Sequence, residues 1–169
     1  MGQVLIYHPA QDAYHCVFRL LLLVDAIPEL EEERARILDF YLVFPSAMSL
    51  IKWPATLVAA KQRSKAERNP YRTPINPSIT FRSMQPLQSS AIRCIAAANL
   101  IDPIALEHGT IRRTDTGLSP LVTERLKLYT QENKSSIDLV VNDLSSIQLL
   151  GRDGLKARTS LMDYRYDSA

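Results

Sequence analysis

Histidines and cysteines are the residues of this chain best suited to metal or nucleophile chemistry. Its three histidines are His8, His15 and His108, and none has an acidic residue, a cysteine or another histidine at the spacing of a metal pair. The two cysteines, Cys16 and Cys94, both lie in apolar runs, which is typical of reduced, buried thiols. The sequence therefore predicts no metal site and no bound cofactor.

Other catalytic patterns are also missing from the sequence. The five glycines are scattered, so no glycine-rich loop could cradle a phosphate. No nucleophile elbow and no pair of metal-binding carboxylates occurs along the chain. Because catalysis needs an activated group and a partner that orients it, we predict that this chain is not an enzyme.

Composition places the chain among folded globular proteins. Its 169 residues are 46% hydrophobic and 22% charged, which is enough for one domain with a buried core. The net charge of +2 does not by itself indicate a nucleic-acid partner. The longest apolar run, Val17–Val24, is interrupted by Arg19 and is too short to span a bilayer. We expect a cytoplasmic protein without a membrane segment.

Hydrophobic periodicity predicts a mainly helical fold. Asp12 caps a buried helix that ends near Ala26, and the acidic run Glu29–Glu33 forms the exposed start of a second helix. A third helix is expected from Pro86, and Ser119 with Pro120 begins another. The remaining elements expected are a small β-hairpin at 104–114 around the Gly109 turn and a C-terminal helix that ends before Gly151.

This order of elements predicts a winged-helix-like domain over residues 1–150. Residues 46–82, rich in proline, are expected to form an insertion or an arm without regular packing. Residues 151–169 are expected to form a polar, poorly packed tail. Aromatic and basic residues in such irregular segments often anchor partners.

Two groups of candidate binding residues follow from these segments. The aromatic residues expected to contact a protein partner are Trp53, Tyr71, Tyr164 and Tyr166. For Trp53 the alternative is packing in the domain's own core. The basic residues expected to contact a nucleic-acid backbone are Lys61, Arg63, Lys65, Arg68, Arg112 and Arg113. The last two of these lie on the predicted hairpin.

The sequence leaves two functions open. A DNA-binding transcriptional regulator is compatible with the winged-helix order and with the basic residues. The helix expected to read bases, however, carries only Arg93 as a cation between Leu87 and Leu100. Helices rich in alanine pack well against protein, which favours an adaptor subunit instead.

Five short segments resemble one bacterial family. They are Tyr7-His8-Pro9, Phe18–Leu21, Asp39–Pro45, Met84–Gln88 and Ala97–Ile101. These segments are similar to the middle component of ABC-three-component defence systems, a group that includes the Lamassu type. The similarity extends over most of residues 1–131, and its motifs are mainly hydrophobic packing positions.

The resemblance implies a role without catalysis. The middle component of such a system is expected to link an SMC/Rad50-like ATPase, which senses foreign DNA, to an effector such as a nuclease. Both partners would be encoded in the same operon. The complex could also contact DNA without reading its sequence, and no catalytic residue transfers from the family to this chain.

Overall fold

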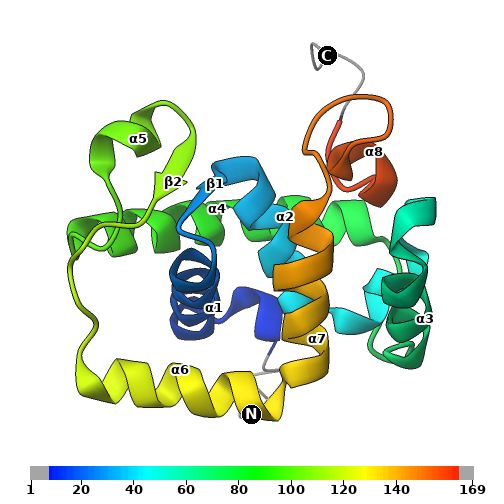
Figure 1. Cartoon of the computed structure of the whole chain (residues 1–169), viewed down its shortest axis with the longest axis horizontal. Helices are drawn as coiled ribbons and strands as arrows, with labels where there is room; N and C mark the ends of the chain where they lie inside the picture. The colour runs from blue at the N-terminus through cyan, green and yellow to red at the C-terminus, as the bar shows by residue number, and fades with distance from the viewer. Residues whose placement is uncertain (1–7, 164–169) are drawn as a thin grey trace, which may run out of the picture.

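The structure, a computed structural model, describes residues 8–163. Figure 1 shows the central helix α1 end-on, with α4 above it, α2 and α7 beside it and α6 below it. The long helices are α1 (Ala13–Ala26), α2 (Glu32–Val43), α3 (Val58–Ala66), α4 (Pro77–Ala97) and α6 (Pro120–Glu132). The shorter elements are β1 (Glu29–Glu31), α5 (Pro103–Glu107), β2 (Thr110–Arg112), α7 (Lys134–Asp138) and α8 (Leu155–Thr159). The prediction of a mainly helical fold with a small antiparallel β element is confirmed.

Helix α1 forms as its sequence predicts. The Asp12 carboxylate accepts a hydrogen bond from the His15 backbone N–H at 2.9 Å, which caps the first turn. The helix ends at Ala26, two residues before Pro28. Residues 19–24 are all buried, so the helix is surrounded by protein over its second half. Its main neighbours are α2 and α4.

Helix α4 begins nine residues earlier than the sequence predicts. Asn76 caps it by accepting a hydrogen bond from the Ile79 N–H at 3.2 Å, and Pro77 occupies the first turn. Pro86 therefore lies inside the helix, where it lacks the N–H that would bond to the preceding turn. The helix continues because buried residues recur at helical spacing on both sides of the proline. They are Phe81, Met84, Gln88, Ala91, Ile92 and Ile95.

The two-stranded sheet joins distant parts of the chain. Strand β1 pairs antiparallel with β2, with Leu30 opposite Ile111, and Ile101 forms a bridge with Arg113. Gly109 has a φ of 75°, a left-handed conformation that suits glycine, and it lies between α5 and β2. This placement of strands around the helices is consistent with a winged-helix domain.

The predicted first strand of the hairpin was misplaced. Residues 103–107 form helix α5, because the Asp102 carboxylate caps its first turn through the Ile104 N–H at 2.9 Å and Pro103 follows the cap. The strand that pairs with β2 comes instead from the acidic run Glu29–Glu33, of which only Glu32 and Glu33 belong to a helix.

The C-terminal region packs more tightly than expected. Helix α7 continues through a π-helical turn, Leu139–Asp143, into a short 3₁₀ turn, Leu144–Ser146. Beyond it, Leu155 is fully buried and Leu161 is 4% exposed. The prediction of a poorly packed tail after residue 150 is therefore wrong for the described residues, because these apolar side chains complete the core.

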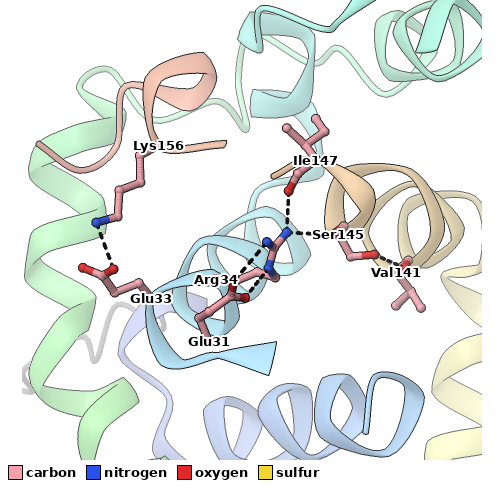
Figure 2. Close-up of polar contacts among 7 residues, drawn as sticks. All are labelled: Glu31, Glu33, Arg34, Val141, Ser145, Ile147 and Lys156. Atoms are coloured by element: carbon pink, nitrogen blue, oxygen red, sulfur yellow. Dashed lines mark hydrogen bonds and ion pairs between the residues drawn. The ribbon is translucent and has the colours of Figure 1, made fainter. Parts of the chain in front are cut away.

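Two basic residues attach this C-terminal region to α2 (Figure 2). Arg34 donates from Nη1 to the carbonyl oxygens of Ser145 at 2.6 Å and Ile147 at 2.5 Å. Lys156, only 4% exposed, forms an ion pair with Glu33 at 2.9 Å. Because Arg34 satisfies carbonyls that follow the π turn, it fixes where the chain leaves the helix.

Replacement of Arg34 by Met is expected to lower the free energy of unfolding by about 1–3 kcal/mol, because two part-buried carbonyls lose their donor. Denaturant unfolding measures this loss, and hydrogen exchange should quicken after residue 146. Glu31→Gln is the matched control, because it alters only the partly exposed ion pair with Arg34. An equal loss for both variants would contradict the assigned role of the carbonyl contacts.

Arg34 also donates from Nε to the Glu31 carboxylate at 2.6 Å, and this hydrogen bond lowers the pKa of Glu31 below its ordinary value of 4.5. A carboxylate with a lowered folded-state pKa stabilises the fold above its unfolded-state pKa. This contribution is present at neutral pH and is lost as the pH falls through the lowered value.

A buried polar cluster joins the three central helices. Arg19 donates from Nε to the Asp39 carboxylate at 2.7 Å, and Gln88 donates to the same carboxylate at 2.9 Å. All three side chains are at least 95% buried. Cys16 lies nearby, and burial raises the pKa of its thiol to about 12. The prediction of two buried thiols is confirmed for Cys16 but is wrong for Cys94, which is exposed on α4.

Candidate partner-binding groove

The first part of segment 46–82 is not an irregular arm. Ser46, Ala47 and Met48 are buried in the 3₁₀ helix Pro45–Leu50. Trp53 is 8% exposed, and its indole Nε1 donates to the Met48 carbonyl at 3.1 Å. The apolar residues of this stretch therefore extend the domain core, and the alternative proposed for Trp53, packing within its own domain, describes where the structure places it.

The loop between α3 and α4 is held by local hydrogen bonds. The Asn69 side chain accepts from the Tyr71 N–H at 3.0 Å, and the Asn69 carbonyl accepts from the N–H groups of Arg72 and Thr73. Thr73 Oγ1 also donates to Ser46 Oγ at 2.9 Å, which attaches the loop to the buried 3₁₀ helix. The loop is thus ordered by its own turn chemistry.

This loop, the end of α2 and the start of α4 enclose a groove of about 650 Å³, here called the α2–α4 groove. Its lining residues are His8, Val43, Phe44, Tyr71, Arg72, Thr73, Pro74, Ile75, Asn76, Ile79 and Thr80. Tyr71 is 98% exposed, Ile75 is fully exposed and Ile79 is 56% exposed. Large apolar side chains displayed together in this way are typical of a binding surface.

Two arginines lie in or next to the α2–α4 groove. Arg72 lines it, and no carboxylate appears among its described lining residues. Arg68 lies in an adjoining hollow that shares Arg72, where Glu67 is hydrogen-bonded by Ser135. Lys61 and Lys65 lie one turn apart on α3. Lys61, Lys65, Arg68 and Arg72 are exposed, and none forms an ion pair with another described residue.

The other predicted basic residues already have acidic partners. Arg63 forms an ion pair with Asp143. Arg112 pairs with Glu29 at 2.8 Å and lies 3.6 Å from Asp102, and the hydrogen bond that Arg112 donates to the Glu29 carboxylate raises the pKa of Arg112.

Arg113 contacts Asp25 at 3.3 Å and donates to the carbonyls of Leu100 and Thr114. These contacts hold β2 against its neighbours. Figure 1 shows β2 and α3 at opposite ends of the molecule, so the six predicted basic residues do not form one surface.

The predicted aromatic residues are also separated. Tyr71 lies on the α2–α4 groove, whereas Trp53 is buried. Tyr164 and Tyr166 lie outside the described residues. Sequence reasoning missed Ile75 and Ile79; the available signal was an isolated apolar residue between two prolines, Pro74 and Pro77, in a polar stretch.

Residues 8–163 contain neither a metal-binding cluster nor a membrane-spanning helix. Within that range His, Cys, Asp and Glu side chains nowhere gather in a group of three or more that could hold a metal ion. No helix in the same range combines the length and the apolar character needed to cross a bilayer.

Comparison with known proteins identifies the family. Residues 5–167 match the family model described as ABC-three component (ABC-3C) system Middle Component 5. Neither the curated proteins nor the solved structures gave a match. The matched range covers nearly the whole chain, including both sides of the α2–α4 groove. This chain therefore belongs to the Middle Component 5 family of ABC-three-component systems.

Proposed function

We propose that this chain is a non-catalytic adaptor of a bacterial defence complex, which links an SMC/Rad50-like ATPase to an effector such as a nuclease. Membership of a middle-component family supports a role among other components. The observation that carries the proposal is the exposed apolar rim of the α2–α4 groove, formed by Tyr71, Ile75 and Ile79. The finer assignments, a Lamassu-type system in the cytoplasm and these two partner classes, rest on the sequence resemblance.

Co-expression tests this proposal. The full chain, tagged at one end, is expressed with the ATPase and the effector encoded beside it, and the complex is purified. We expect both subunits to be retained, and we expect the isolated chain to show no turnover of ATP or DNA. A chain that stays monomeric beside both neighbours would contradict the adaptor role.

DNA contact within the complex is a separate part of the proposal. Lys61 and Lys65 are exposed and have no acidic partner among the described residues, so they are available for phosphate contacts that position DNA without reading it. Replacement of both lysines by Glu is expected to weaken retention of DNA by the assembled complex and to leave its composition unchanged. Loss of a subunit instead would assign these residues to a protein interface.

A winged-helix transcriptional regulator is the second candidate function. It is favoured by the placement of β1 and β2 beside the helices and by Lys61 and Lys65 on α3, which are exposed and have no ion pair within the described part of the chain. A regulator would bind one promoter duplex tightly on its own, with affinity that falls steeply as salt rises. An adaptor is expected to show weak or no duplex binding alone, so a binding titration at several salt concentrations separates the two functions.

A further inference from the structure

We propose that the α2–α4 groove binds an amphipathic segment of a partner subunit that carries acidic side chains beside aliphatic ones. This inference rests on the proposed adaptor function and specifies its surface and the chemistry of its partner. It follows from the shape, order and charge of the groove.

The groove fits a few side chains from one segment of protein. Its volume of about 650 Å³ is within the range of pockets that enclose a compact ligand or several anchoring side chains. Partly buried Val43 and Phe44 line it from the end of α2, while Tyr71, Ile75 and Ile79 project into solvent around it. An aliphatic or aromatic anchor placed between these residues would cover apolar surface on both sides.

The groove is also preorganised. Tyr71 and Arg72 are held by hydrogen bonds to Asn69, and Thr73 is bonded to Ser46 of the buried 3₁₀ helix. The cap that Asn76 provides fixes the start of α4, which carries Ile79. A binding surface that is ordered in advance loses less conformational entropy when a partner binds.

The positive charge of the groove indicates that the partner segment is acidic. Arg72 lines the groove without a carboxylate among the described lining residues, and Arg68 lies in the adjoining hollow. Acidic side chains that flank the apolar anchors would complement this charge and would speed association.

Other occupants fit the groove less well. Nucleic acid would use the cations and could stack on Tyr71, but it would leave Ile75 and Ile79 without apolar contacts. A second copy placed symmetrically would bring the same cations face to face. The apolar segment Val4–Tyr7 of this chain has no acidic residue to complement the groove.

The test compares two variants of the full chain in the co-expressed complex. The groove variant combines Tyr71→Ala, Ile75→Ser and Ile79→Ser, and the charge variant combines Arg68→Glu with Arg72→Glu. The matched control combines Ile104→Ser with Leu121→Ser, which are exposed apolar residues outside the groove. Because every replaced side chain is exposed, melting curves should show that all variants remain folded.

We expect the groove variant to bind one partner subunit about tenfold more weakly or worse, since clustered apolar anchors dominate such interfaces. The charge variant should also bind more weakly, with less dependence on salt, and the control should bind like the unmodified chain. Overlapping peptides of the partner subunits identify the segment, which should contain aliphatic residues together with Asp or Glu.

The outcomes separate this inference from the proposed function. If the unmodified chain retains neither subunit, the adaptor function itself is wrong. If it retains a subunit equally with and without the groove substitutions, or if the bound peptides lack acidic residues, only the groove inference is overturned.

Three other results would also overturn the inference by identifying a different occupant. The first is loss of binding to a short DNA duplex, with subunit binding intact, in the groove variant. The second is a homodimer, detected by light scattering, that the groove variant disrupts. The third is tighter subunit binding after deletion of residues 1–7, which would indicate that the chain's own segment competes for the groove.

Discussion

Replacement of Arg19 by Met should lower the free energy of unfolding by about 3–5 kcal/mol, because it leaves the Asp39 carboxylate buried without its cation. Asp39 is fully buried, and Arg19 donates to it from Nε at 2.7 Å and from Nη2 at 3.3 Å. Within the cluster of Arg19, Asp39 and Gln88, only the Gln88 side chain would still donate a hydrogen bond to the Asp39 carboxylate. Met retains most of the buried apolar contacts of the arginine stem, so the loss reports mainly on the unpaired charge.

Denaturant unfolding followed by the fluorescence of Trp53, the single tryptophan, measures this effect. In a domain of this size each kcal/mol lowers the melting temperature by about 2–4 °C. Arg93→Met is the matched control, because Arg93 is exposed on α4 and has no ion pair among the described residues; its effect should stay within about 0.5 kcal/mol. A loss below about 1 kcal/mol for the Arg19 variant would show that the folded chain accommodates Asp39 in another way.

The double variant Arg19→Met with Asp39→Leu separates two causes of destabilisation, the unpaired Asp39 carboxylate and the lost packing of the Arg19 side chain. Removing both charges should recover part of the stability lost in the single variant, because no buried charge then remains unpaired. No recovery would indicate that packing, rather than the unpaired carboxylate, causes the loss.

Truncation of Leu21 to Ala is the second large effect expected, with a loss of about 2–5 kcal/mol from the removed apolar contacts and the cavity left behind. Leu21 is 6% exposed in the core formed by α1 with its neighbouring helices. Arg68→Ala provides the comparison: its side chain is exposed and unpaired among the described residues, so it should change stability by less than about 0.5 kcal/mol. Equal melting losses in the two variants would mean that the core lies elsewhere.

These variants also separate stability from partner binding. Arg68 belongs to the basic surface beside the α2–α4 groove, whereas Arg19 and Leu21 lie inside the domain. A substitution that weakens complex formation without lowering the melting temperature therefore identifies the interface. A substitution in the core should weaken complex formation only through loss of folded chain.

Local signals in the sequence determined several elements of this protein. Asp12 caps α1, Ser119 with Pro120 begins α6, and Gly109 forms the turn before β2. Each of these features depends on a residue's own backbone preference or on a hydrogen bond within one turn. Such interactions require no distant partner, so the sequence alone could predict them. The resemblance of short hydrophobic segments likewise indicated the middle-component family that the family model confirmed.

Only the tertiary structure decided which distant residues meet. Glu29–Glu31 reads as the acidic start of a helix, yet it becomes a strand because β2 supplies the hydrogen-bonding partner about eighty residues later in the chain. Pro86 is a helix start by local preference, but burial on both sides of it keeps α4 continuous.

Tertiary packing also decided which basic residues form ion pairs and which stay exposed. Arg19, Arg112 and Arg113 find acidic partners on other elements, while Lys65 and Arg68 are exposed with none among the described residues. The sequence does not distinguish these cations, because a basic residue looks the same in the sequence whether or not folding brings an acidic residue next to it. Which ones remain available for a partner depends on the packing of helices that lie far apart in the chain, and that packing placed Arg68 beside the α2–α4 groove.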